Sequence, residues 1–89
     1  MHKQNLESLK VHLLKQTWPN VYLYKFIISN NNSTLALINA LFHEGSDIRF
    51  KPSAKGNFMS VSASEVAFSV DEIIEKYLKA AEIPGVIAL

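Results

Sequence analysis

Residues 21–29, Val-Tyr-Leu-Tyr-Lys-Phe-Ile-Ile-Ser, carry the pattern that decides the fold. The stretch is rich in β-branched and aromatic residues, and its side chains alternate between two faces, as they do in a strand. One face is wholly apolar, whereas the other carries Lys25. We therefore predict a strand that buries an aromatic face: Tyr22, Tyr24, Phe26 and Ile28.

Helices are predicted on both sides of this strand. Leucines at helical spacing predict an amphipathic helix over residues 5–16, with Asn5 as its N-cap. After the strand, residues 30–33 offer capping side chains for a second helix, which ends near Gly45. The buried stripe of the first helix is expected to be Leu6, Leu9, Leu13 and Leu14.

A hairpin and a third helix complete the chain. Residues 47–51 and 58–67 alternate in polarity and flank a turn, so they predict two paired strands. Ser69 and Glu72 have the spacing of a capping box that opens a helix. Residues 86–89 predict a short last strand. On the exposed side of the third helix we expect two i,i+4 ion pairs, Glu72 with Lys76 and Glu75 with Lys79.

The order of these elements after the first helix is βαββαβ. Right-handed crossovers place the two intervening helices on one face, and the split βαβ arrangement gives an antiparallel sheet ordered 4-1-3-2. We therefore predict an α+β, ferredoxin-like sandwich over residues 19–89 with an N-terminal helical extension over residues 1–18, in one domain of 1–89. Its expected core is Tyr24, Phe26, Ile28, Leu35, Ile38, Phe42, Ile48, Phe50, Val61, Ala63, Ile73, Tyr77 and Leu78.

Composition limits the function classes that suit this fold. A chain of 89 residues has room for a single domain. Its net charge of +1 argues against strongly electrostatic partners, and its lack of cysteine excludes disulfides, thiol catalysis and cysteine-ligated zinc. We see no apolar run of the length of a leader or membrane span. We expect a cytoplasmic protein without a membrane partner.

A turn motif carries a resemblance to a known family. Residues 51–62, Lys-Pro-Ser-Ala-Lys-Gly-Asn-Phe-Met-Ser-Val-Ser, are similar to the turn signature of the YbeD-like family, small bacterial proteins of unknown function. Trp18-Pro19, residues 22–28 and residues 83–86 also agree, so the resemblance covers nearly the whole chain. It implies a ferredoxin-like fold similar to regulatory ACT domains, without enzymatic activity or cofactor.

One feature of the ACT analogy is missing. ACT modules typically bind an amino acid at a glycine-bearing loop between the first strand and the following helix. This chain has Asn30-Asn31-Asn32 at that place, which argues against amino-acid binding.

The sequence offers no catalytic constellation. His2, His12 and His43 are too far apart for a metal-binding pair, and we expect all three to be exposed. The glycines are isolated, so they form no phosphate-binding loop. We predict a non-catalytic protein that needs neither metal nor cofactor.

The best local candidate for a site is the basic hairpin turn. Exposed turn amides, two lysines and a hydroxyl are suited to bind an anion. The alternative is a turn that needs glycine for its backbone and lysines for solubility. The residues concerned are Lys51, Ser53, Lys55, Gly56 and Asn57.

The open face of the sheet is a second candidate. RNA-binding domains of this topology stack bases on aromatic residues of the central strands. Here the expected face carries Phe58 as its one aromatic residue, beside Lys25, Arg49 and Lys51, so nucleic-acid binding is the runner-up hypothesis.

The third candidate is an interaction surface. The last strand is expected at a sheet edge and carries no charge that would discourage pairing, so it favours a homodimer unless the first helix covers it. The leading hypothesis is thus a small regulatory or interaction module. Its partner is an unknown protein or small-molecule ligand.

Overall fold

The computed structural model describes residues 3–89. Its elements are α1 (Lys3–Leu13), β1 (Asn20–Ser29), α2 (Asn32–Asn39), β2 (Asp47–Pro52), β3 (Phe58–Ala67), α3 (Val70–Ala81) and β4 (Val86–Ala88). The strands form one antiparallel sheet in the order β2-β3-β1-β4, which read from the β4 edge is 4-1-3-2. The α+β class and the antiparallel sheet are confirmed, and the arrangement is compatible with a ferredoxin-like fold.

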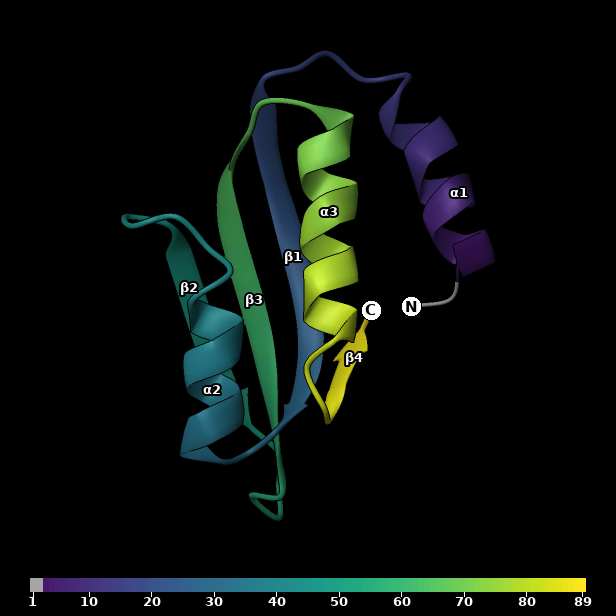
Figure 1. The fold of residues 1–89 in the computed structure, drawn as a ribbon. Coiled ribbons are helices and arrows are strands. Elements are labelled where there is room, and N and C mark those ends of the chain that lie inside the picture. Colours follow the sequence, from purple (N-terminus) through teal and green to yellow (C-terminus); the bar gives the residue numbers. More distant parts are fainter. Residues whose placement is uncertain (1–2) are drawn as a thin grey trace.

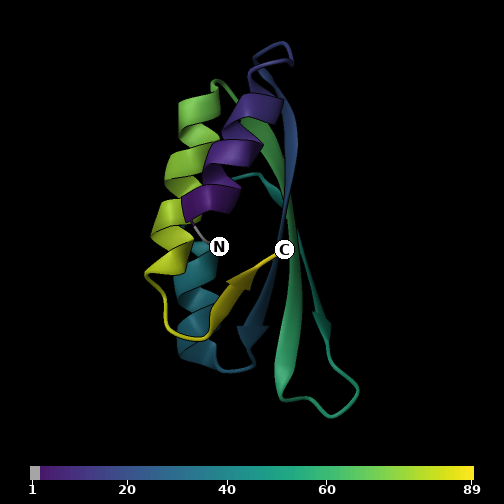
Figure 2. The same cartoon turned by 90° about the vertical axis from the view of Figure 1, so that its right-hand side faces the viewer.

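The helices lie together on one face of the sheet, and within residues 3–89 no helix covers the other face (Figures 1 and 2). β1 and β3 are the two central strands and pair over ten residues, from Asn20 opposite Ala67 to Ser29 opposite Phe58. This register aligns the inward side chains of both strands beneath α2 and α3, which is where the core and the candidate site form.

The core is built on the aromatic face of β1. Tyr24, Phe26 and Ile28 are fully buried, as the alternation predicts. Phe42 and Tyr77 close over them, with ring centroids 5.4 Å from that of Tyr24 in each case. Four aromatic side chains thus pack together between the sheet and the helices.

Two predicted core residues are wrong. Phe50 is 42% exposed, because β2 is an edge strand and the short α2 covers only part of it. Leu78 is 51% exposed, because the buried stripe of α3 runs through Ile73, Tyr77 and Ala80 and points Leu78 away from the sheet. Lys76 occupies the inward position beside Tyr77.

The boundaries of the first two helices differ from the predictions. Asn5 lies inside α1 and is not its N-cap. α2 is capped by Asn31, whose side chain accepts the Thr34 N–H, and it ends at Asn39, well before Gly45. Gly45 has a φ of +89° within the following loop and is not a helix cap. Residues 40–46 therefore form a connection of turns between α2 and β2.

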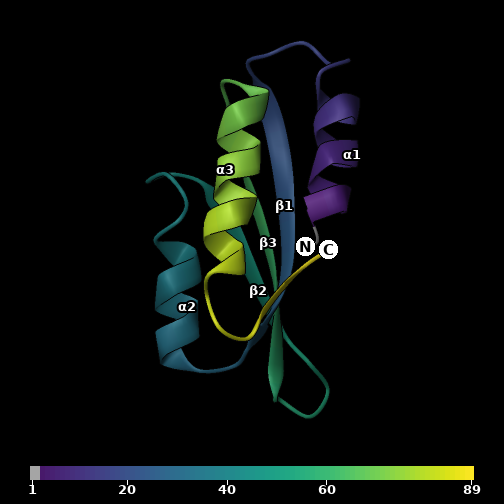
Figure 3. The ribbon, with the colours of Figure 1, turned by 45° about the vertical axis from the view of Figure 1, so that its right-hand side comes forward.

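α1 packs beside α3 on the helical face of the sheet (Figure 3). Leu6 and Leu13 are buried in the common core, and the Trp18 indole donates to the Leu13 carbonyl at 3.0 Å. The predicted stripe is wrong at Leu14, which is 62% exposed. The leucine stripe thus serves this chain's own core.

Across residues 3–89, the helices are all too short or too polar to cross a membrane.

Candidate functional site

A buried ion pair joins the sheet to α3. Glu65 occupies an inward position of β3, where the alternation places Val61, Ala63 and Ala67 as well, and it is only 6% exposed. Lys76 of α3 is 8% exposed, and its Nζ contacts Glu65 Oε1. Buried charges are stable only when paired and hydrogen-bonded, so these two side chains depend on each other.

The second oxygen of Glu65 holds the α2–β2 loop. Glu65 Oε2 accepts the backbone N–H of His43 at 2.9 Å and the hydroxyl of Ser46 at 2.7 Å. Because α2 ends at Asn39, the His43 N–H is not bonded within that helix, and the carboxylate accepts it instead. One acidic side chain connects the loop, β3 and α3.

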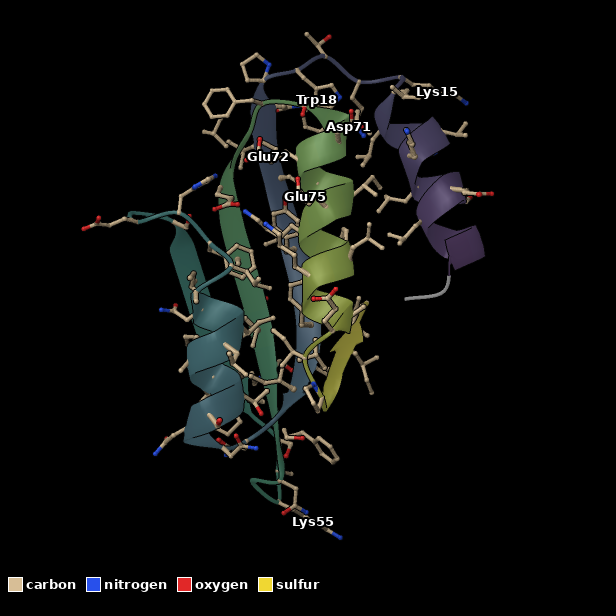
Figure 4. The ribbon with its side chains drawn as sticks, in the orientation of Figure 1. Lys15, Trp18, Lys55, Asp71, Glu72 and Glu75 are labelled. Carbon is tan, nitrogen blue, oxygen red and sulfur yellow. The ribbon has the colours of Figure 1, made fainter. Side chains whose placement is uncertain are left out.

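A second carboxylate approaches the same place from the first turn of α3. Glu72 Oε2 accepts the Phe68 N–H at 2.7 Å, while its own N–H donates to Ser69 Oγ at 3.2 Å, which confirms the predicted N-cap. The other oxygen, Oε1, lies 3.1 Å from His43 Nε2. In Figure 4, Glu72 extends from α3 towards β3.

The environment of Glu72 favours its ionised form. Burial acts to raise the pKa of Glu72, but the Phe68 N–H and the His43 ring outweigh it and hold that pKa below its ordinary value. Glu72 therefore presents a negative charge to the His43 ring at neutral pH.

His43, Glu65 and Glu72 converge. His43 Nε2 lies 3.1 Å from Glu72 Oε1 and 3.9 Å from Glu65 Oε1, and one ligand atom from each residue lies within 4.8 Å of the others. The His43 side chain is 59% exposed, so it forms the solvent side of the cluster. Beside the cluster, an open groove of about 220 Å³ runs between the end of α2 and α3. We call His43, Glu65, Glu72 and Lys76 the polar cluster.

Aromatic rings form the inner wall of the polar cluster. Lys76 Nζ lies 5.4 Å from the ring centroid of Tyr24 and 5.1 Å from that of Phe42, within the range of cation–π attraction. Tyr77 shares a hydrogen bond of 2.9 Å with the hydroxyl of Tyr22. The Tyr24 hydroxyl is buried and has no hydrogen-bond partner among residues 3–89. Burial raises the pKa of both Tyr24 and Tyr77, and the charge of Glu72 adds to the effect on Tyr24.

One predicted ion pair does not form as expected. Glu75 and Lys79 lie 3.3 Å apart on the exposed side of α3, as predicted. The predicted partner of Glu72 was Lys76, but Lys76 turns inward and binds Glu65. The buried Glu65 carboxylate needs a counter-charge more than Glu72 does, whose side chain is 24% exposed, and this favours the inward direction of the lysine.

The hairpin candidate lies at the other end of the sheet from the polar cluster. Figure 4 shows Lys55 at the tip of the β2–β3 turn, far from Glu72. Ser53 Oγ accepts the Phe58 N–H at 3.2 Å, and Ser53 O accepts the N–H of Gly56, whose φ is +74°. These groups are thus used within the turn. Anion binding by Lys51, Ser53, Lys55, Gly56 and Asn57 stays a prediction.

The sheet-face candidate residues do share a surface. Lys25 and Arg49 both lie opposite Ser62, from the two sides of β3, and Lys51 lies opposite Ser60 in the next row. Phe58 is 51% exposed at the start of β3. The structure therefore gathers basic residues of β1 and β2 on the face opposite the helices.

The polar cluster was missed by the sequence reading. Its members come from a loop, a strand and a helix, so their spacing along the chain carries no motif. The available signal was the position of Glu65 in the alternation of its strand, which places it on the same inward face as Val61 and Ala63. His12 is exposed as predicted, whereas His2 lies outside the described residues.

The fold has a counterpart among solved structures. It is similar to the structure of uncharacterized protein TM1266 from Thermotoga maritima, with a TM-score of 0.65 and 18% sequence identity over 79% of this chain and 91% of that one. At this identity the likeness concerns the fold alone. No family model matches the chain, and no curated protein matches it either.

Proposed function

We propose that this chain is a small, non-catalytic regulatory or interaction module of the cytoplasm that acts by binding a second copy of itself through its uncovered sheet face. The observation that carries the proposal is the placement of the helices on one face of the sheet (Figure 2), because Leu23 and Ile87 of β1 and β4 are exposed. The sequence resembles the YbeD-like family, and this resemblance implies a fold similar to regulatory ACT domains. Such a fold agrees with the proposed role.

The exposed apolar residues form a stripe along β1 and β4. Ile27 lies opposite Ile87, and Leu89 lies beside Lys25 through a hydrogen bond from its N–H to the Lys25 carbonyl. The exposed fractions are 48% for Leu23 and 59% for Ile87. Contiguous apolar surface of this kind marks interaction sites in soluble proteins.

Charge favours a second copy as the occupant. The basic residues Arg49 and Lys51 lie on β2, at the edge opposite to β4. A two-fold axis along the β1–β4 stripe would join the apolar stripes and leave each basic edge outside the contact. Such packing keeps Arg49 and Lys51 out of the contact and leaves Lys25, which lies between Leu23 and Ile27 on this face, as a basic residue inside it.

The oligomeric state tests this proposal. Sedimentation velocity over a concentration series is expected to show a reversible dimer. The double variant Leu23→Lys/Ile87→Lys should weaken the dimer by at least about tenfold, because it puts four charges into the apolar contact. Leu78→Lys is the matched control, since this exposed leucine lies on α3. A wild-type chain that stays monomeric at high concentration contradicts the proposal.

A nucleic-acid-binding module is the second candidate. The row of Lys25, Ser62 and Arg49, with Lys51 beside it, is the observation that favours it. Affinity for single-stranded RNA, measured by fluorescence anisotropy, should fall with salt with a logarithmic slope of about −2, as expected for three phosphate contacts. Arg49→Glu should abolish binding, whereas Lys79→Glu on the helical face should not. Binding that is absent or insensitive to salt rejects this candidate.

A further inference from the structure

We propose that His43, Glu65 and Glu72 bind a divalent transition-metal ion, with Zn²⁺ as the best-matched class. The site lies on the helical side of the sheet, so it is independent of the dimer surface proposed above. The argument rests on the convergence of the three ligand atoms, on the groups that orient them and on the unpartnered hydroxyl beside them.

The distances among the ligand atoms suit one metal ion. Ligand atoms about 2.1 Å from a metal are about 3–4 Å apart in tetrahedral or octahedral geometry. His43 Nε2 lies 3.1 Å from Glu72 Oε1 and 3.9 Å from Glu65 Oε1. All three ligand atoms lie within 4.8 Å of one another, so small side-chain movements complete the set.

Both carboxylates are oriented by donors on their far oxygens. Glu65 Oε2 accepts from the His43 N–H and the Ser46 hydroxyl, and Glu72 Oε2 accepts from the Phe68 N–H. Glu72 Oε1 then lies 3.1 Å from His43 Nε2, whereas Glu65 Oε1 contacts Lys76 Nζ and lies 3.9 Å from the same nitrogen. Metal sites use outer hydrogen bonds of this kind to fix the direction of their ligands.

One further observation points to a polar ligand beside the cluster. In the metal-free chain Glu65 Oε1 is neutralised by Lys76 Nζ, which a metal would have to displace. The Tyr24 hydroxyl is fully buried and unpartnered within the described part of the chain, and the charge of Glu72 acts on it. A buried hydroxyl without a partner is uncommon in a folded protein, and a bound polar ligand is one way to satisfy it.

The donor set and its access select the metal class. One imidazole nitrogen with two carboxylate oxygens suits Zn²⁺ and its transition-metal neighbours, whereas Mg²⁺ and Ca²⁺ prefer oxygen ligands alone. The exposed His43 ring and the groove between α2 and α3 provide a path from solvent. The metal would replace the ammonium of Lys76 at Glu65 Oε1, so the two cations compete.

The test uses the full chain after removal of metals with a chelator. We expect a titration with ZnCl₂, monitored by calorimetry and by NMR of the histidine rings, to show one saturable site. The ring signals of His43 should shift. His43→Gln should weaken Zn²⁺ binding by at least about tenfold, because it removes a direct ligand. The matched controls are His12→Gln and His2→Gln, which should bind Zn²⁺ as the wild type does.

The role of Lys76 gives a second, sharper outcome. Lys76→Met should bind Zn²⁺ more tightly than the wild type, since it removes the competing ammonium. If that variant does not fold, Glu72→Gln, at a partly exposed position, should show weakened binding while its circular dichroism stays native. The proposal is overturned if no saturable binding occurs, if His43→Gln binds like the wild type, or if the loss follows His12 or His2 instead.

Discussion

Replacement of Lys76 by methionine is expected to lower the free energy of unfolding by about 3–5 kcal/mol. Methionine fills much of the same space among Tyr24 and Phe42, but it leaves the buried Glu65 carboxylate without its counter-charge. Urea unfolding of the metal-free chain at neutral pH measures the change. Lys79→Met is the matched control, and its effect should be below about 1 kcal/mol because Lys79 pairs with Glu75 on the surface.

A double variant separates loss of the partner from loss of the pair. Glu65→Leu/Lys76→Met removes both charges, and buried ion pairs are often replaced by apolar residues at little cost. We therefore expect the double variant to be more stable than Lys76→Met alone, although it also loses the Glu65 bonds to His43 and Ser46. If Lys76→Met were as stable as the wild type, the buried Glu65 carboxylate would not need Lys76 as its counter-charge.

Raising the pH above about 10 is expected to destabilise the protein steeply. Tyr24 and Tyr77 have pKa values raised by burial, while in the unfolded chain both ionise near pH 10. The folded state thus keeps protons that the unfolded state loses, so this stability is complete below about pH 10 and is lost as pH rises. Each tyrosine contributes a slope of about −1.4 kcal/mol per pH unit.

Single phenylalanine variants identify the source of this slope. Urea unfolding at several pH values should show that Tyr24→Phe and Tyr77→Phe each remove about half of the tyrosine contribution. At neutral pH, Tyr24→Phe should also be at least as stable as the wild type, because the hydroxyl that it removes has no partner. Variants with the same pH profile as the wild type would contradict the assignment.

The sequence predicts the framework well because strand and helix periodicity report local burial. The alternation of β1 and the N-cap Ser69 are both confirmed, although the Glu72 carboxylate accepts the N–H of Phe68 and not that of Ser69. Errors occur where burial depends on neighbours far along the chain. Phe50 has an inward position in β2, but its exposure depends on how much of it the short α2 covers.

The polar cluster illustrates the same limit for function. The residues of the basic hairpin around Lys55 are contiguous in sequence, so their pattern predicts a site. His43, Glu65 and Glu72 become neighbours only because α2 ends early and its loop turns back over β3. The direction of Lys76 is likewise decided by the fold, since helical spacing favours Glu72, whereas Glu65 comes within reach only when α3 packs on β3.

The position of Glu65 also has a consequence for the dynamics of the chain. Its two oxygens bind the loop at His43 and Ser46 and bind α3 at Lys76. If α3 detaches, Glu65 loses its counter-charge, and if the loop detaches, Glu65 loses two hydrogen bonds. Loop and helix therefore open as one cooperative unit. The exchange of the His43 amide proton with solvent reports the docking of a helix that lies almost thirty residues further along the chain.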